Sequence, residues 1–445
     1  MADDLPASHV MIVGAGLGGL LLGILLEKAG IPYQIYERAT AIKPLGSAMG
    51  FGANILPVFE QLGLLEELLK VSYPCPSVDM YDPQLNVLGG FEFEQYRERT
   101  GYDTIMFARP ALHNLLLSHV PAEKIKYGKR VLSLLQNENG VMIRCSDGTS
   151  YEGDILVGAD GAHSGVRQSL YQALATALPS VDKESMNAGH ICMVGTTESL
   201  DAEKYPALKD ELAHCKRIIG EKSSYSWSVV TVPENKVCWA VISQLDAKEA
   251  KCTTFKNSEW GPESNAAMIK DCYNFPSPLG GTMGELIDAT PPSMISKVAL
   301  EDKLFETWTH GRTVLIGDGQ GAVNAFQDAV ILANCIYDMP SVTHENIMTA
   351  FKDYKNQRYP HAKYQIEKTR IMGKMLYGQT WSERLTRHLI FNWIPKRIQT
   401  EQFLKDASYR PQCTFLPYVK SRGSGPVLEQ KQSKSRSVPE TAVTI

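Results

Sequence analysis

The sequence predicts an α/β fold in which a nucleotide-binding unit comes first, a domain rich in β-sheet follows, and helices close the chain. Three observations predict it. A strand, a glycine-rich turn, a helix and a second strand follow one another within residues 10–37. Runs rich in β-branched and aromatic residues dominate the stretch from about 180 to 300. Helix-forming residues then fill most of the chain from about 325 to 375.

The chain has 445 residues, of which 44% are hydrophobic and 21% are charged. This size and composition allow a large core divided into about two or three domains. The formal net charge is only -4, and no basic block stands out. Electrostatics therefore gives no argument for a nucleic-acid partner, and a small molecule is the better expectation.

The nine cysteines are scattered, and no two have the two-residue spacing of a metal knuckle. We expect buried reduced thiols and no metal site. The apolar stretch Val10–Leu26 is interrupted by five glycines, which fit a nucleotide-binding turn better than a signal peptide. The run Leu389–Ile394 is too short to cross a bilayer. We expect a cytoplasmic protein without a transmembrane span, and leave peripheral membrane contact open.

The first unit begins with the apolar strand Val10–Val13, which ends in glycines. A helix over Leu17–Ala29 and a strand over Tyr33–Tyr36 follow, and the strand ends on Glu37. Glu37 lies 23 positions after Gly14, close to the roughly 20-residue spacing of dinucleotide-binding units. This order predicts a Rossmann-like unit.

The glycines of this unit suit a bound pyrophosphate. Gly14 and Gly16 permit a turn that lets phosphates approach the backbone, while Gly19 lets the helix pack closely on the strand. The Glu37 carboxylate is suited to accept hydrogen bonds from ribose hydroxyls. The alternative is a glycine-rich packing turn with a surface glutamate. The unit cannot distinguish NAD from FAD.

Further along the chain, Ala111–Val120 is expected to form a helix introduced by Arg109-Pro110. Val141–Cys145 and Ile155–Val157 are expected to be strands joined by a turn at Asp147-Gly148. Arg109 itself is either a ligand contact or a solvated residue at a helix start.

Three strands are expected in the β-rich stretch: His190–Val194, Tyr225–Val232 and Val237–Gln244. The segment Pro233–Asn235 reads as the hairpin turn between the last two. The simplest arrangement is an antiparallel sheet laid over the nucleotide-binding domain.

The last part begins with the expected strand Thr313–Ile316, followed by a helix over Ala325–Tyr337. Glu345–Met375 is strongly helical in composition, and we expect Pro360 to break it. After Tyr418 the chain becomes polar, and composition predicts a disordered tail.

Two later motifs combine glycine with an acidic residue at a strand end. The first is Gly158-Ala159-Asp160-Gly161, and the second is Gly317-Asp318 followed directly by Gly319-Gln320-Gly321-Ala322. The carboxylates of Asp160 and Asp318 could each hold a ribose or ribityl hydroxyl by a charge-assisted hydrogen bond. For Asp160-Gly161 an ordinary turn is the alternative.

With these motifs, the chain over roughly residues 8–375 resembles the flavin-dependent aromatic hydroxylases typified by para-hydroxybenzoate hydroxylase, and within them the fungal FAD monooxygenases of secondary metabolism. The resemblance rests on the glycine turn with Glu37, on Arg109 in Met106–Pro110, on Gly158–Arg167 and on Gly317-Asp318. It implies cofactor-binding residues at Gly14, Gly16, Gly19, Glu37, Arg38, Gly50, Arg109, Asp160, Asp318, Gly321 and Ala322.

The resemblance also implies individual roles. The segment around Asp160 would serve both FAD and a transient NADPH, Arg109 would contact FAD, and Asp318 would hold the ribityl chain. His163 is a tempting base, but a structural role in the cofactor loop is preferred. We assign no catalytic side chain.

The corresponding domain organisation is an FAD-binding domain over 8–180 and 301–375, with a β-rich substrate domain over 181–300 between its two parts. A C-terminal helical extension would occupy 376–420 and a disordered tail 421–445. The implied chemistry is reduction of FAD by NADPH, reaction with O2, and transfer of one oxygen atom to a hydrophobic small organic substrate. The sequence does not separate NADPH from NADH.

The substrate is expected between the β-rich sheet and the flavin. Tyr225, Trp227 and Trp239 could line its site, although core packing is the better expectation for each.

One departure from the family concerns Asp318, which is bonded directly to Gly319. In relatives a loop of roughly nine residues, containing a proline near the flavin, separates them. Such a loop can span up to about 30 Å, whereas adjacent Cα atoms are 3.8 Å apart. Either the strand end or the helix start is expected to move. A flavin oxidase or dehydrogenase, and a pseudoenzyme impaired by this short connection, remain alternatives.

Overall fold

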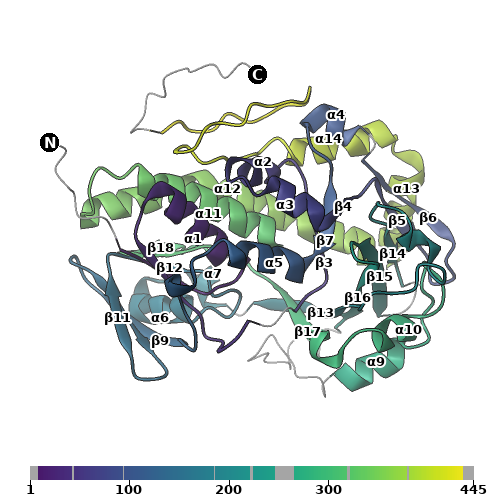
Figure 1. The fold of residues 1–445 in the computed structure, drawn as a ribbon, viewed down its shortest axis with the longest axis horizontal. Helices are drawn as coiled ribbons and strands as arrows, with labels where there is room; N and C mark the ends of the chain where they lie inside the picture. Colours follow the sequence, from purple (N-terminus) through teal and green to yellow (C-terminus); the bar gives the residue numbers. More distant parts are fainter. Residues whose placement is uncertain are drawn as a thin grey trace.

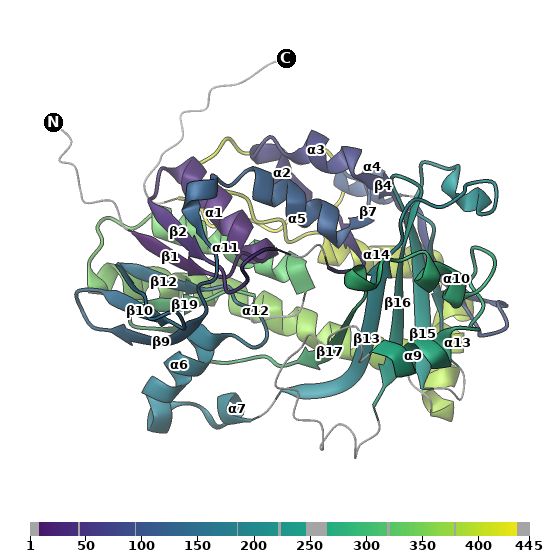
Figure 2. The same ribbon diagram turned by 60° about the horizontal axis from the view of Figure 1, so that its bottom comes forward.

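A computed structural model describes residues 9–42, 45–93, 95–184, 186–220, 224–245, 265–317, 321–377 and 380–433. The protein has a mixed α/β fold with two large sheets. A parallel sheet with helices packed on it forms one side of the molecule, and a mainly antiparallel sheet forms the other (Figures 1 and 2). The long helix α12 (His344–Tyr377) runs from one side to the other.

The first sheet has six strands in the order β18-β19-β12-β1-β2-β8. Its strands are β1 (Val10–Val13), β2 (Tyr33–Tyr36), β8 (Ile125–Lys126), β12 (Ile155–Gly158), β18 (Thr309–His310) and β19 (Thr313–Leu315). All neighbours are parallel except β18 and β19. β1 lies in the middle and is fully buried, which explains its continuous apolar sequence.

Helix α1 (Leu17–Ala29) packs against the first sheet, α5 (Arg109–Ser118) and α11 (Gly321–Tyr337). Because neighbours surround it, α1 is apolar on nearly every side. It ends at Gly30, whose left-handed backbone (φ 68°) lets its N–H bond the carbonyls of the last turn. α12 covers α11 from outside.

Helix α12 continues through Pro360, so the expected break at this residue is wrong. Pro360 is exposed, while Tyr354, Ala362 and Ile366 on either side are almost completely buried. A proline costs a helix about 3 kcal/mol. Burial of a single large apolar side chain contributes roughly 1.5–3 kcal/mol, so packing on both sides of Pro360 outweighs the local penalty.

The second sheet has seven strands in the order β17-β13-β16-β15-β14-β5-β6. These are β5 (Ser77–Tyr81), β6 (Val87–Glu92), β13 (Asn187–Thr196), β14 (Cys215–Ile218), β15 (Tyr225–Val232), β16 (Lys236–Gln244) and β17 (Ser296–Asp302). Only β14 and β5 are parallel neighbours. The turn between β15 and β16 places Glu234 and Asn235 at positive φ, as two-residue hairpin turns require. β5 and β6 come from outside residues 181–300.

One face of this sheet carries a compact apolar core. Trp227 and Trp239 lie in it with the short helices α9 (Ala266–Cys272) and α10 (Met283–Asp288). The Trp239 indole N–H donates to Thr290 Oγ1 at 2.9 Å, and that of Trp227 donates to the Pro276 carbonyl at 2.9 Å. Both side chains therefore serve packing.

Two three-stranded sheets complete the β structure: β3 (Ala48–Phe51), β7 (Ile105–Ala108) and β4 (Ser72–Pro74) form one, and β9 (Val131–Gln136), β10 (Val141–Cys145) and β11 (Ser150–Gly153) form the other. The turn at Asp147-Gly148 connects β10 to β11, and not to the strand at Ile155 as expected. Ile155, Leu156 and Val157 have no exposed surface, so this run belongs inside the parallel sheet.

The remaining helices are α2 (Leu56–Gln61), α3 (Leu65–Lys70), α4 (Tyr96–Thr100), α6 (Gly165–Leu174), α7 (Ser180–Lys183), α13 (Trp381–Trp393) and α14 (Lys396–Asp406). Among the described residues, no helix is both long enough and apolar enough to cross a bilayer. The eight cysteines in the described parts of the chain are free and buried.

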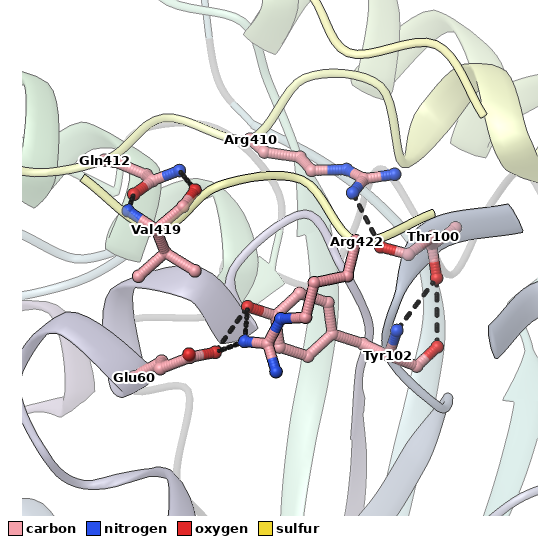
Figure 3. Close-up of polar contacts among 7 residues, drawn as sticks. All are labelled: Glu60, Thr100, Tyr102, Arg410, Gln412, Val419 and Arg422. Carbon is pink, nitrogen blue, oxygen red and sulfur yellow. Dashed lines mark hydrogen bonds and ion pairs between the residues drawn. The ribbon is translucent and has the colours of Figure 1, made fainter. Parts of the chain in front are cut away.

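The C-terminal segment 408–433 lies across α2 and α4 (Figure 1). Arg410 donates to the Thr100 carbonyl at 2.8 Å, and Gln412 exchanges hydrogen bonds of 2.9 and 3.0 Å with the backbone of Val419 (Figure 3).

Residues 421–433, expected as part of a disordered tail, are ordered in the structure. Arg422 bonds the Glu60 carboxylate and the Tyr102 hydroxyl (Figure 3). A Cβ on Gly423 would lie 2.3 Å from the Arg99 carbonyl. Composition did not predict this, because hydrogen bonds and ion pairs hold the segment in place, and not an apolar core.

Candidate functional site

The first two glycine motifs and Gly317 of the third meet at the carboxyl ends of β1, β12 and β19, which are neighbouring parallel strands. Val13 pairs with Gly158, and the Ala159 N–H donates to the Val13 carbonyl at 2.8 Å. Gly158 pairs with Leu315 on its other side. Segments 145 to 300 residues apart in sequence thus share one edge, the place where open α/β sheets bind ligands.

The glycine turn after β1 is fixed by close backbone contacts. Gly14 has φ +110°, and a Cβ there would lie 2.5 Å from the Ala159 carbonyl oxygen. A Cβ on Gly19 would lie 2.0 Å from the Gly14 carbonyl oxygen. Both glycines are therefore required by packing within the chain.

Gly16 differs from these two glycines. A Cβ on Gly16 would meet no atom within 4 Å. Gly16 is also the N-cap of α1, where no side chain bonds the first amides of the helix. Open space at an uncapped helix start fits a pyrophosphate, because the amides and the helix dipole favour an anion there.

Glu37 lies at the end of β2 beside the glycine turn. Its two carboxylate oxygens accept the N–H groups of Ala15 and Ala39, each at 2.8 Å. An ionised carboxylate offers about four acceptor positions, so Glu37 can still bind ribose hydroxyls. Arg38 follows it and is exposed.

Asp160 faces its own chain. It accepts the Ser164 hydroxyl at 2.5 Å and the N–H groups of Gly165 and Val166 at 2.7 and 3.3 Å. Burial raises the pKa of Asp160, while the hydrogen bonds of the α6 start oppose the rise. The carboxylate thus stabilises the N-terminus of α6, and any cofactor contact would use its remaining acceptor capacity.

Arg109, the first residue of α5, fastens the loop that precedes β3. Its Nη1 donates to the Leu45 carbonyl at 2.7 Å and its N–H to the Ser47 carbonyl at 2.8 Å. Gly46 (φ +129°) lies so close that a Cβ would be 2.7 Å from Arg109 Cδ. Arg109 therefore positions the loop 45–47, and is not merely a solvated helix-start residue.

Gly50 lies on β3 opposite Met106 of β7. It is exposed, and a Cβ would lie 2.6 Å from Met106 Sδ. The loop before β3 also contacts the second sheet, since Ser47 donates to the Trp239 carbonyl at 3.0 Å and Thr196 donates to the Gly46 carbonyl at 3.2 Å. Residues 45–50 thus lie between the two sheets.

His113 was not singled out from the sequence. It lies one turn after Arg109 on α5, is 6% exposed, and its Nε2 is 3.0 Å from the Ala15 carbonyl. Burial lowers its pKa, so neutral His113 donates from Nε2 and fixes the glycine turn from the other side. The four-residue spacing from Arg109 was the available signal.

Part of the third motif lies outside the described residues, which include Gly317 but not Asp318, Gly319 or Gln320. Gly317 (φ +73°) donates its N–H to Asp328 Oδ2 at 2.9 Å. Gly321 (φ +81°) is exposed at the start of α11, and Ala322 is partly buried beside it. The ends of the short connection are thus described, but the position of the Asp318 side chain is not.

A buried ion pair holds the end of β19 to both long helices. Arg358 of α12 donates from Nε to Asp328 Oδ1 at 2.8 Å, and the two side chains are 0% and 1% exposed. The other Asp328 oxygen accepts Gly317. The pairing of β19 with β12 continues one residue past β19, since the Ile316 N–H donates to the Gly158 carbonyl at 3.0 Å.

His163 Nε2 lies 3.1 Å from Glu301 Oε2 of β17, which places it against the second sheet. A cavity of about 490 Å³ lies elsewhere, between α11, α12 and α14. It contains none of the expected cofactor residues, so it gives no support to the flavin site.

Comparison with known proteins names the ligand class. A family model described as an FAD binding domain matches residues 7–196. The FAD-dependent monooxygenase ptmM of Penicillium ochrochloron is 29% identical over 384 residues, covering 79% of this chain and 85% of the relative. The FAD-dependent monooxygenase paxM of Penicillium paxilli is 28% identical and covers 96% and 91%.

Residues 7–196 thus match an FAD-binding domain, and the chain as a whole is similar to FAD-dependent monooxygenases. Solved structures agree on the fold. HpxO of Klebsiella pneumoniae, complexed with FAD and uric acid, has a TM-score of 0.72 at 21% identity and covers 91% of this chain and 97% of HpxO. The 2,6-dihydroxypyridine-3-hydroxylase of Arthrobacter nicotinovorans has a TM-score of 0.64 at 16% identity, covering 85% and 95%.

Proposed function

We propose that this FAD-dependent monooxygenase consumes NADPH and O2 and inserts one oxygen atom into a hydrophobic small organic molecule of secondary metabolism. The observation that carries the proposal is the meeting of the first two glycine motifs and Gly317 at one sheet edge, with open space at Gly16. The fungal relatives, named as FAD-dependent monooxygenases, support the reaction class.

The residues of this edge fit an extended FAD. The α1 start at Gly16 would hold the pyrophosphate, and Glu37 would accept the adenosine ribose hydroxyls. The loop 45–50, fastened by Arg109, would lie along the flavin ring. The start of α11 at Gly321 and Ala322 would place helix amides near the ring, where they stabilise negative charge. Asp318 is proposed to hold the ribityl chain.

When bound, FAD supplies electron transfer from the nicotinamide and the activation of O2. The protein contributes position and environment. Arg109 and His113 hold the loop and the turn that would contact the cofactor, and the second sheet covers the ring side and excludes water. Few side chains need to move a proton, which agrees with the absence of an assigned catalytic residue.

The substrate is proposed to lie between loop 45–50 and the face of the second sheet that is opposite Trp227 and Trp239. NADPH would bind transiently beside the segment around Asp160.

The test uses the purified full chain loaded with FAD. Flavin absorbance is followed anaerobically after NADPH or NADH is added, and a panel of hydrophobic phenols and enols is then incubated with NADPH and 18O2. Bleaching by NADPH, together with a product carrying one 18O atom, is the expected result.

The other outcomes favour the alternatives. NADPH-independent substrate oxidation, with all oxygen recovered as hydrogen peroxide, would favour an oxidase. A purified protein that lacks yellow colour, and that retains no FAD once unbound FAD has been removed after its addition, would favour a pseudoenzyme.

A further inference from the structure

Helix α13 lies at the outer edge of the second sheet, against β6 and the end of α12 (Figures 1 and 2). Its inward face carries Ile390 and Phe391, which pack with Phe91 and Phe403. The approach is close, since a Cβ on Gly89 of β6 would lie 2.6 Å from Phe391 Cβ. The fold therefore fixes which face of α13 is turned outward.

The outward face of α13 is also apolar. Trp381, Leu385, Leu389 and Trp393 follow one another at intervals of four residues, so they lie along one side of the helix. Their exposed fractions are 73%, 47%, 43% and 76%, which means that no part of the chain described by the structure covers them. We call these four residues the apolar stripe. A surface helix normally turns polar residues outward.

The two tryptophans distinguish the stripe from the single apolar residues that every protein surface has. Trp227, Trp239 and Trp308 are at most 4% exposed. Ile371 of α12 and Ile398 of α14, which precede and follow α13, are 68% and 60% exposed. A concentration of exposed apolar side chains of this kind marks an interaction surface.

The charge of this region differs from that of the whole chain. Residues 370–400 contain six lysines and arginines and one acidic residue, Glu383, whereas the chain has a formal net charge of -4. The Glu383 carboxylate accepts the N–H and the hydroxyl of Thr380 at 3.1 and 2.7 Å. It thus caps the start of α13, and the region is cationic.

Basic side chains border the apolar stripe. Arg384 and His388 each lie three residues after a member of the stripe and therefore beside it on the helix; Arg384 is partly exposed and His388 is exposed. Lys374 near the end of α12 and Arg397 at the start of α14 are exposed as well. The stripe and its border match a surface that is apolar inside and negatively charged outside.

A bilayer that contains anionic lipid has this chemistry. A helix lying in its plane buries leucine and tryptophan at the acyl boundary and keeps arginine and lysine among the headgroups. Tryptophan favours this boundary because its ring is apolar and its N–H is polar. In a symmetric contact with a second copy of the chain, by contrast, the cationic region would face itself.

We propose that the apolar stripe of α13 is a membrane-docking surface, which enters the headgroup region of an anionic bilayer with the helix parallel to the bilayer plane. Trp381 and Trp393 anchor the two ends of the helix, and Lys374, Arg384 and Arg397 bind anionic headgroups. The proposal goes beyond the proposed function and does not depend on FAD.

The experiment uses the purified full chain, with and without FAD, and vesicles of two compositions. One is phosphatidylcholine alone, and the other is phosphatidylcholine with phosphatidylserine at about three to one. Binding is measured by co-sedimentation, and insertion by quenching of tryptophan fluorescence with lipids brominated in the acyl chain. The test variant is W381S/W393S. The matched control is L132S/L135S, which removes two side chains of β9 that are 60% and 52% exposed.

A second pair of variants tests the charges. K374Q/R397Q removes two exposed cations beside the stripe, and K28Q/K270Q removes two exposed cations on α1 and α9. K374Q/R397Q is expected to weaken binding to the phosphatidylserine vesicles about fivefold or more. K28Q/K270Q is expected to bind as wild type does.

Wild type and L132S/L135S are expected to bind the phosphatidylserine vesicles and to show quenching by the brominated lipid. W381S/W393S is expected to bind about tenfold more weakly or worse and to lose most of the quenching. It is also expected to keep the wild-type thermal midpoint, because both side chains are exposed.

Three results would overturn the proposal: a wild type that binds neither kind of vesicle, a wild type that binds without quenching, or a W381S/W393S variant that binds as wild type does. A thermal midpoint several degrees lower in W381S/W393S would instead make the tryptophans structural. Dimerisation that W381S/W393S abolishes, without vesicle binding, would make the stripe a contact between two copies of the chain.

Discussion

The edge formed by β1, β12 and β19 differs in construction from a row of paired residues in the second sheet, Val194, Ser228 and Ala240, which we call the floor row. At the edge, backbone groups almost touch: Gly14 and Gly19 have no room for a methyl group, and Glu37, Arg109 and Asp160 all bond their own chain. In the floor row, side chains are small and are left partly exposed.

This difference separates residues whose type is fixed by the fold from residues that can be exchanged between relatives. The edge is shaped by main-chain geometry, which tolerates few residue types and suits a cofactor of constant shape. The floor row is shaped by side chains, which can be exchanged without disturbing the strands and suit a substrate that differs between relatives. Substitutions at the packed glycines of the edge, Gly14 and Gly19, should therefore affect folding, and those in the floor row should affect ligand choice.

The largest loss of stability is expected from Asp328→Ala. It leaves Arg358 buried without its carboxylate and removes the acceptor of the Gly317 N–H. Removing one partner of a buried pair costs about 3–5 kcal/mol, measurable by urea unfolding. The control is Glu203→Ala, which removes a largely exposed pair with Lys209 and should change stability by less than about 1 kcal/mol. Equal effects would contradict a buried anchor at the end of β19.

Gly19→Ala and Gly16→Ala lie in the same glycine turn but are expected to have different effects, the first on stability and the second on FAD binding. A methyl group on Gly19 would lie 2.0 Å from the Gly14 carbonyl, so we expect a loss of about 3 kcal/mol or more. Gly16→Ala should keep the wild-type thermal midpoint, because its methyl meets no protein atom, but should weaken FAD binding at least tenfold. A Gly16→Ala protein that binds FAD normally would show that the pyrophosphate lies elsewhere.

His113→Leu tests the support of the turn. It removes the donor to the Ala15 carbonyl and should cost about 1–3 kcal/mol. Burial lowers the pKa of His113 in the fold, so the unfolded chain takes up a proton first as the pH falls below about 6.5. Wild type should therefore lose stability on acidification below that pH, and the variant should lose less of it. Parallel pH profiles would argue against a buried neutral His113.

Ala240→Leu is expected to have the smallest effect on stability, less than about 1 kcal/mol, because the Ala240 side chain is partly exposed. The same change should weaken substrate binding, because Ala240 lies on the face of the sheet that is proposed to meet the substrate. Val229→Ala on the other face, where the side chain has no exposed surface, is the matched control and should destabilise without changing ligand preference. A strongly destabilised Ala240→Leu would show that the floor row is packed.

The sequence predicted the edge well because its signals are local. Strands Val10–Val13 and Tyr33–Tyr36 and helix Leu17–Ala29 begin and end at the expected residues. The same holds for β15, Tyr225–Val232. Each has a regular apolar pattern bounded by glycine, proline or a charged residue, so the information needed lies within a few residues.

The rest depends on contacts between distant segments. Nothing near Pro360 shows that apolar packing continues on both sides of it, and nothing in the polar composition after Tyr418 shows that Arg422 meets Glu60. β5 and β6 join the second sheet from far along the chain. His113 gains significance only from what surrounds it in the fold. Asp318 stays a prediction.

The central claim is that a flavin dinucleotide binds along the edge formed by β1, β12 and β19. The most direct measurement is equilibrium titration of the purified chain with FAD, FMN and ADP, repeated with Glu37→Gln. FAD should bind at least tenfold more tightly than FMN, ADP should compete with it, and Glu37→Gln should reduce this advantage. Equal affinity for FAD and FMN, or no binding of FAD, would contradict the claim.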